Sequence, residues 1–284
     1  MRRAVWAFIE NEVRVLKAAG RHALARVLCI ANQKGGVGKT TTAVNLADAL
    51  AKSDRRTLLV DLDPQCNATS ALGAKAVDHH PLLMDEPLSD LQVGIYPDTL
   101  AVLPGSRNID DVQRLAASDE TDRRHLLSRL ATTHATFDTV VIDCPPSLGR
   151  LTQTALMASS EVLMPIQCEF FAMEGLTQMI EVIRDVMHSE TSQLDFGGIL
   201  LTMYDPTLEL TLEVDAEVRD FFGEVVFETV IPRDINAAEA PSHGQSVLEY
   251  APRCRATRAY IELCMEVLER CLLYTSPSPR DIGE

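Results

Sequence analysis

The stretch Gln33-Lys34-Gly35-Gly36-Val37-Gly38-Lys39-Thr40-Thr41-Thr42 decides how the chain folds. It follows a short apolar run at residues 27–31 and precedes an amphipathic run at residues 41–52. A glycine-rich loop between a strand and a helix is the setting in which phosphate-binding loops occur. The sequence therefore predicts a strand, a phosphate-binding loop and a helix at this place.

The residue types of the loop suit a polyphosphate. Glycines let the backbone amides point inward, and the positive end of the following helix is directed at the same spot. Lys39 supplies a cation for the β- and γ-phosphate oxygens, and the Thr40 hydroxyl is placed to bind the Mg²⁺ of a nucleotide. The residues expected to bind the nucleotide here are Gly35, Gly36, Val37, Gly38, Lys39, Thr40 and Thr41.

The loop departs from the ordinary motif G-x-x-x-x-G-K-[ST], because Gln33 stands where glycine is required and an additional lysine stands at position 34. The run Lys34-Gly-Gly-Val-Gly-Lys39-Thr40 resembles the deviant Walker A motif of the ParA/MinD family. That resemblance implies an Mg²⁺-dependent ATPase that dimerises around two ATP molecules, with Lys34 of each subunit reaching the phosphates bound by the other. A glycine-rich turn with solvated lysines is the alternative, and the strand, loop and helix order disfavours it.

Two further apolar runs end in carboxylates. Residues 57–61 lead into Asp61 and Asp63, and residues 137–143 end at Asp143. Continuous apolar runs indicate a parallel sheet buried on both faces, and such sheets gather ligands at the carboxyl ends of their strands. A strand that ends in aspartate is the Walker B arrangement, so Asp143 is our candidate for the Mg²⁺ shell.

The segments around these carboxylates resemble family signatures. Residues 61–73 are similar to the second signature, although Cys66 and Ala71 stand where glycine is usual. By this resemblance Asp63 orients the attacking water, and Asp61 supports the Mg²⁺ ion and the phosphate loop. Capping of the next helix is the alternative, and it is attractive for one of these aspartates but a poor account of both together.

Two later segments extend the resemblance. The run Asp143-Cys-Pro-Pro-Ser-Leu-Gly149 is more similar to ParA than to MinD, and its two prolines must take the chain out of the sheet close to the γ-phosphate, as a switch would. In Ile231-Pro232-Arg233-Asp234, the family places residues near the adenine, which makes Pro232 and Arg233 candidate nucleotide contacts.

Strand and helix patterns alternate along the chain, which predicts an α/β fold with a doubly wound, mostly parallel sheet, here a P-loop NTPase. We expect strands at 27–31, 57–61, 100–103, 137–143, 161–167, 198–204 and 225–231. We expect helices at 41–52, 109–116, 122–131, 174–188, 209–222 and 256–270. Residues 74–100 are expected to be irregular, with His79 and His80 as a solvated surface pair rather than a metal site.

The ATPase domain is expected at residues 27–270, between two segments that the resemblance does not cover. Residues 1–26 carry apolar and basic positions at roughly helical spacing, and family members normally begin closer to their first strand. A packing helix, an interaction helix for DNA or a membrane surface, and a non-native extension compete here, and we favour the first or the third. Residues 271–284 resemble the translation of a sequencing-library adapter, so we interpret them as a non-native tail that replaces the natural C-terminus.

The amino-acid composition limits which classes of protein this chain can belong to. The 284 residues are 46% hydrophobic and 24% charged, which allows one full hydrophobic core. No run approaches 18 apolar residues and no secretory signal pattern is present, so we expect a cytoplasmic protein, nucleoid-associated if it binds DNA. The seven cysteines contain no C-x-x-C pair, and we interpret them as free thiols rather than a disulfide or zinc framework.

The formal net charge of −15 repels nucleic acid overall, so DNA binding requires a local basic patch. ParA proteins bind nucleoid DNA without sequence preference through basic residues of later helices and loops. Thr207 and Asn236 stand at two of the family's usual arginine positions, which implies weakened binding. The remaining arginines form either a basic cluster or ordinary surface charge, and they are Arg233, Arg253, Arg255 and Arg258.

Three function hypotheses follow. The first is a ParA/Soj-type ATPase of chromosome or plasmid partitioning, in which ATP pairs two chains, favours DNA binding, and is hydrolysed when a ParB-like partner stimulates it. Slow intrinsic turnover is expected, because no arginine finger is evident. The second is a MinD-like or other cargo-positioning ATPase that does not use nucleoid DNA. The third is a reductase similar to the nitrogenase iron protein, for which Cys144 alone is an insufficient cluster ligand.

Overall fold

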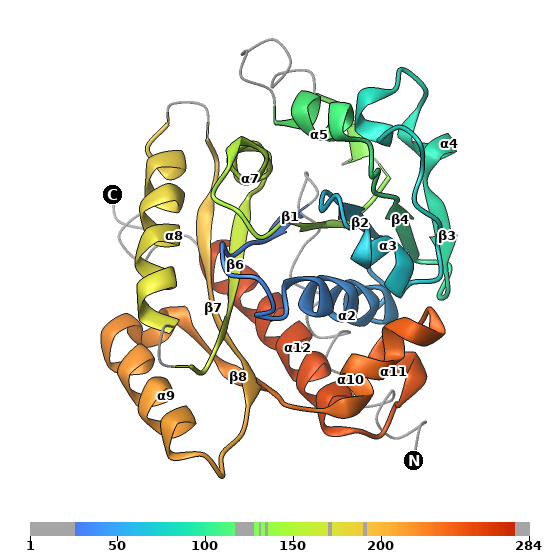
Figure 1. Cartoon of the computed structure of the whole chain (residues 1–284). Coiled ribbons are helices and arrows are strands. Elements are labelled where there is room, and N and C mark those ends of the chain that lie inside the picture. Colours follow the sequence, from blue (N-terminus) through green and yellow to red (C-terminus); the bar gives the residue numbers. More distant parts are fainter. Residues whose placement is uncertain are drawn as a thin grey trace, which may run out of the picture.

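Figure 1 shows a computed structural model of the 284-residue chain. It describes residues 26–116, 128–130, 132–133, 136–169, 172–189 and 192–275. The expected N-terminal extension therefore lies outside the described residues except for Arg26. The same holds for most of the helix expected at 122–131 and for residues 276–284 of the expected tail.

Among the described residues, eight strands form one sheet in the order β3-β4-β2-β5-β1-β6-β7-β8. The strands are β1 (Arg26–Ile30), β2 (Thr57–Asp61), β3 (Val93–Ile95), β4 (Leu100–Leu103), β5 (Thr139–Asp143), β6 (Glu161–Gln167), β7 (Asp195–Tyr204) and β8 (Val226–Pro232). Neighbouring strands are parallel except β3, which pairs antiparallel with β4. The mostly parallel sheet expected from the sequence is confirmed, and β1 lies in its interior between β5 and β6.

Helices cover both faces of this sheet (Figure 1). The described helices are α2 (Lys39–Lys52), α3 (Asn67–Ala71), α4 (Leu88–Leu91), α5 (Ile109–Leu115), α7 (Arg150–Met157), α8 (Ala172–Met187), α9 (Glu209–Phe222), α10 (Ile235–Glu239), α11 (Val247–Tyr250) and α12 (Arg255–Thr275). Core side chains of α7, α8 and α9 belong to one apolar cluster, and those of α2, α11 and α12 belong to a second.

The strands separate these two clusters because successive side chains point to opposite faces. In β1, Val27 and Cys29 belong to the cluster under α7–α9, whereas Leu28 and Ile30 belong to the cluster under α2 and α12. Because both faces are buried, β1, β2 and β5 have near-continuous apolar sequences, as parallel strands require. Because these strands are parallel, the polar residues that follow them lie at one edge of the sheet.

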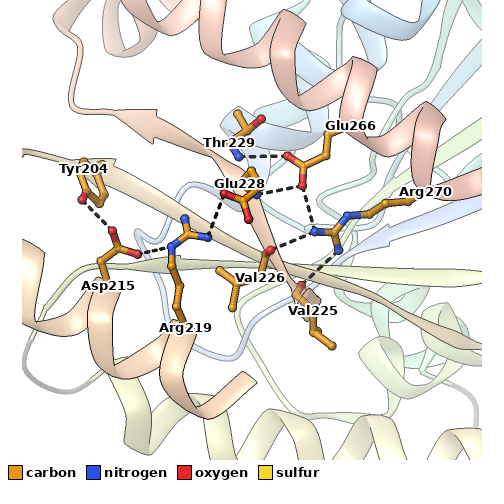
Figure 2. A network of polar contacts seen from close by, with 9 residues as sticks. All are labelled: Tyr204, Asp215, Arg219, Val225, Val226, Glu228, Thr229, Glu266 and Arg270. Carbon is orange, nitrogen blue, oxygen red and sulfur yellow. Dashed lines mark hydrogen bonds and ion pairs between the residues drawn. The ribbon is translucent and has the colours of Figure 1, made fainter. Parts of the chain in front are cut away.

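The C-terminal helix α12 is longer than the helix expected at 256–270, and a polar network joins it to the sheet (Figure 2). Arg270 donates to the carbonyls of Val225 and Val226 at 3.3 and 3.0 Å and to Glu266 at 2.9 Å. Glu266 accepts the backbone amides of Glu228 and Thr229 on the edge strand β8. This network satisfies β8 amide groups that have no strand beyond them, and so covers an exposed sheet edge.

The first turn after α3 packs directly on the turn before α11. A Cβ atom at Gly244 would lie 2.9 Å from the Cα of Gly73, and Gly244 has a φ of +65°. Both the left-handed backbone and the close approach favour glycine here. The turn after α3 is thereby placed against the turn before α11. No described helix is long and apolar enough to cross a membrane.

Candidate nucleotide-binding site

The phosphate loop connects β1 to α2 at the carboxyl edge of the sheet. Gly36 and Gly38 have φ values of +76° and +87°, a left-handed conformation that side chains rarely adopt. A Cβ atom at Gly35 or Gly36 would meet nothing within 4 Å, so space lies above the loop. The loop therefore has open space beside it and leads directly into the N-terminus of the 14-residue helix α2, where unpaired helix amides favour an anion.

Lys39 lies inside this loop. Its side chain is buried, and its ammonium group donates to the Lys34 carbonyl at 2.7 Å. Burial lowers the pKa of Lys39, while the nearby Asp143 and Asp63 carboxylates act in the opposite direction. A charge-assisted hydrogen bond to phosphate is stronger than one to a neutral backbone carbonyl. A phosphate bound in the loop would therefore stabilise the buried ammonium group of Lys39.

Thr40 and Asp143 meet beside Lys39. The Thr40 hydroxyl donates to Asp143 Oδ2 at 2.8 Å, whereas the fully buried Oδ1 has no hydrogen-bond partner among the described residues. Burial, followed by the charge of Asp61, raises the pKa of Asp143 well above its usual range. A buried carboxylate oxygen without a donor is suited to a cation or to a water bound to one.

These donors fit Mg²⁺. Thr40 and Asp143 offer a hydroxyl and a carboxylate, which are the hard oxygen ligands that Mg²⁺ prefers. Among the described residues no group of three or more His, Cys, Asp or Glu could hold a metal by itself. Mg²⁺ is usually held by one or two carboxylates together with substrate phosphates, so an incomplete protein shell is the expected arrangement.

Asp61 organises the loop that follows β2. Its Oδ2 accepts the backbone amide and the hydroxyl of Thr69, at 2.8 and 2.5 Å, and its Oδ1 accepts the Asp63 amide at 3.2 Å. Burial raises the pKa of Asp61 to about 6. Asp61 therefore holds Asp63 and Thr69 in place through both of its oxygens, while Asp63 is buried beside Lys39.

His80 is part of the same assembly, so the expectation of a solvated histidine pair is wrong for this residue. Its ring is fully buried, accepts the Leu82 amide at Nδ1, and donates from Nε2 to the Asp61 carbonyl at 3.0 Å. Burial lowers the pKa of His80 to about 4, so the ring is neutral near pH 7. The Asp111 carboxylate of α5 accepts the His80 amide at 2.7 Å and fixes this turn. His79, by contrast, is exposed.

The Lys34 side chain is paired within the chain. Its ammonium group forms an ion pair with Glu169 at 2.9 Å, just after β6. Asn32 fixes the start of the loop, because it accepts the Lys34 amide and donates to the Pro165 carbonyl. The sequence pattern does not identify Asn32, Glu169 or Thr69 as site residues. Asn32 and Glu169 lie shortly after strands, but the contacts of all three residues become apparent only in the folded structure.

The adenine-side candidates lie at the same edge of the sheet. β8 ends at Pro232, and the Arg233 amide donates to the Tyr204 carbonyl at the end of β7. Within β7, the Thr202 hydroxyl donates to the Val37 carbonyl of the phosphate loop at 2.9 Å. The ends of β7 and β8 and the phosphate loop are thereby connected.

Six cysteines have described side chains and are free thiols, as expected; they are Cys29, Cys66, Cys144, Cys168, Cys254 and Cys264. Cys29 and Cys144 lie 3.3 Å apart, sulfur to sulfur, in the core below Asp143. Cys66 has a φ of +55°, which explains why glycine is common at this position in the family signature.

Comparison with known proteins agrees with this geometry. A family model described as an AAA domain matches residues 25–196. The chain is 40% identical to the chromosome partitioning protein ParA of Myxococcus xanthus, covering 90% of this chain and 92% of that protein. It is 40% identical to the sporulation initiation inhibitor protein Soj of Bacillus subtilis (86% and 98% covered) and 43% identical to the chromosome-partitioning ATPase Soj of Thermus thermophilus (87% and 97%).

Solved structures share the fold. A cobyrinic acid a,c-diamide synthase from Mycobacterium smegmatis, solved with an ATP analogue and magnesium, is 35% identical with a TM-score of 0.67, covering 82% of this chain and 98% of that one. The cell division ATPase MinD of Pyrococcus furiosus is 24% identical with a TM-score of 0.72 (87% and 99% covered), which shows a common fold and no more. Because relatives named ParA or Soj at about 40% identity match along nearly their whole length, the chain belongs to the ParA/Soj family of ATPases.

Proposed function

We propose that this chain is a nucleotide-switched partitioning ATPase that binds ATP with Mg²⁺ and pairs with a second copy of itself. The observation that carries the proposal is the joint placement of Lys39, Thr40 and Asp143 at an open glycine loop, with one Asp143 oxygen buried and without a partner among the described residues. ATP and Mg²⁺ satisfy these groups together, because phosphates replace the Lys34 carbonyl as acceptor for Lys39 and a cation faces Asp143.

The residues take the following roles in the proposal. Amides of Gly35 to Thr41 bind the phosphates, and Pro232 with Arg233 contacts the adenine side. Thr40 and Asp143 hold Mg²⁺, which when bound neutralises charge on the β- and γ-phosphates. Asp63 orients the water that attacks the γ-phosphate, and Asp61 keeps Asp63 in position through the Asp63 amide.

Lys34 acts between two chains. In one chain its ammonium group pairs with Glu169, and the two side chains are 37% and 47% exposed, so little free energy is needed to separate them. We assign Lys34 to the phosphates of the second chain, where a charge-assisted contact replaces the Glu169 pair. ATP binding then decides whether two chains associate, and hydrolysis separates them.

A ParB-like protein is the proposed partner that stimulates hydrolysis, and duplex DNA is the proposed surface on which the pair acts, in the cytoplasm. The arginines Arg233, Arg253 and Arg255 support DNA binding, since they lie together in the α10–α12 region, where Arg255 donates to the Arg233 carbonyl. Cargo positioning without DNA is a second candidate, favoured by Thr207 and Asn236 at two usual arginine positions.

Hydrolysis of ATP by an Asp63→Ala variant tests the proposal. We expect phosphate release in the presence of Mg²⁺ to fall about 100-fold or more, because the water loses its orienting carboxylate, while ATP affinity changes little and ATP-bound dimers accumulate. Ser89→Ala, at an exposed position of α4, is the control and should match the parent chain. Unchanged hydrolysis in Asp63→Ala would remove Asp63 from the mechanism.

A further inference from the structure

Helix α9 carries the most acidic surface stretch of the described chain. Residues 205–228 contain one arginine, Arg219, and eight carboxylates, which are Asp205, Glu209, Glu213, Asp215, Glu217, Asp220, Glu224 and Glu228. About half of the formal net charge of −15 therefore comes from this short segment. Such a concentration of one sign creates a local field that attracts cations and repels anions.

On the inner side of α9 the charge of Asp215 is already paired (Figure 2). Asp215 accepts from the Tyr204 hydroxyl at 2.8 Å and pairs with Arg219 at 2.6 Å, and Arg219 also lies 3.9 Å from Glu228. Val214 and Val218 pack into the core and fix the helix on the sheet. The buried and half-buried side of α9 thus needs no further partner.

The outer side is different. Glu209, Glu213, Glu217 and Asp220 are exposed, follow one another at helical spacing along one crest, and have no described cation within ion-pair distance. Large apolar side chains lie beside this crest, with exposed fractions of 52% for Leu208, 41% for Leu210, 49% for Leu212 and 74% for Phe221. Exposed apolar side chains that gather on one element mark an interaction surface.

We propose that this crest, Glu209 to Phe221, is a docking surface for a basic amphipathic segment of another protein. Lysine or arginine at helical spacing would face the four carboxylates, and aliphatic side chains of the segment would cover the leucines and Phe221. DNA does not fit, because its phosphates are repelled by the same carboxylates. The same face of a second copy does not fit either, since like charges would meet. This inference does not depend on the proposed partitioning role.

A labelled 20-residue peptide with lysine at every fourth position and leucine beside it serves as the probe, and its fluorescence anisotropy reports binding. Glu213→Lys with Glu217→Lys should weaken binding about tenfold, and Leu210→Ser with Phe221→Ser should weaken it by a similar factor. Asp85→Lys with Glu86→Lys changes the net charge equally at an exposed site elsewhere and should leave binding within about twofold. A scrambled peptide of the same composition should bind more weakly.

Equal weakening by the Asp85 and Glu86 pair, or equal binding of the scrambled peptide, would reduce the effect to general charge attraction and overturn the proposal. So would an absence of peptide binding, or serine variants that bind as the parent does. Loss of self-association in the serine variants, measured by sedimentation, would assign the surface to a second copy instead. ATP hydrolysis in all these variants should stay at the parent rate, because none of the changed residues contacts the nucleotide site, so a failure here leaves the proposed function standing.

Discussion

Asp61, Asp63 and Asp143 bring three carboxyl groups into one buried region beside a single buried ammonium group, Lys39. Burial raises the pKa of Asp61 and that of Asp143, and the neighbouring negative charges act in the same direction. Such an arrangement is costly for a protein without a bound cation. This excess of buried negative charge suits a site in which Mg²⁺, bound together with the nucleotide, supplies the missing positive charge.

His80 provides a pH-dependent test of this region. Its pKa is about 4 in the folded chain and 6.5 in the unfolded reference, so the unfolded state binds more protons between these values. Stability from neutral His80 is therefore fully present above about pH 6.5 and is lost as the pH falls through about 4. The pKa difference corresponds to about 3 kcal/mol in the free energy of unfolding.

Urea unfolding of the parent and of His80→Asn at pH values from 4 to 7 measures this contribution. Asparagine retains an acceptor for the Leu82 amide and does not titrate. The difference in unfolding free energy between parent and variant should grow by about 3 kcal/mol from pH 4 to 6.5 and then stay constant. A difference that is independent of pH would show that the His80 ring is not buried in its neutral form.

At the residue level, the sequence pattern predicts which polar residues gather at the phosphate loop, and their functional roles stay predictions, whereas it does not predict contacts that tertiary packing decides. The phosphate loop, Asp61, Asp63 and Asp143 were identified because each follows an apolar strand, and the fold brings Lys39 together with Asp63 and Asp143. His80 was misjudged because its partners, Asp61 and Asp111, come from 19 and 31 residues away. No local pattern distinguishes such a histidine from its exposed neighbour His79.

At the level of elements, α12 depends on its anchor to β8. Arg270→Ala should lower the free energy of unfolding by about 1–3 kcal/mol, because it leaves the Val226 carbonyl and Glu266 without their charged donor and removes the guanidinium stacked 4.0 Å from the Phe227 ring centroid. Arg258→Ala is the matched control on the same helix. Arg258 also pairs with a glutamate four residues away, Glu262, but is 82% exposed.

Chemical denaturation of both variants provides the measurement. Arg258→Ala should leave the free energy of unfolding close to that of the parent, because exposed ion pairs contribute little to stability. Equal losses in the two variants would mean that the carbonyl contacts of Arg270 contribute nothing beyond its ion pair.

The long buried strands and helices were predictable from periodicity, whereas β3 and α3 were not. β3 has three residues including Gly94, and α3 begins after Cys66 in a left-handed conformation rather than after an ordinary capping residue.

At the level of the whole molecule, charge decides the relation to DNA. The acidic α9 begins two residues after Thr207, and Asn236 lies within α10, so the parent should bind non-specific duplex DNA weakly even with ATP. Thr207→Arg with Asn236→Arg should tighten ATP-dependent binding and steepen the slope of log affinity against log salt by about 2, since each new phosphate contact adds about 0.9. Ser89→Arg at a distant exposed site is the control. An unchanged slope in the double variant would place the DNA contact elsewhere.

The central claim is that ATP joins two chains through Lys34, and the molecular mass in solution tests it most directly. Multi-angle light scattering with Mg²⁺ and a non-hydrolysable ATP analogue should show twice the 31.2 kDa chain mass for the parent. Lys34→Ala should remain at the mass of one chain while still binding a fluorescent ATP analogue, because Lys39 and the loop amides are intact. A parent chain that stays single at saturating nucleotide, or a Lys34→Ala variant that dimerises as the parent does, would contradict the account.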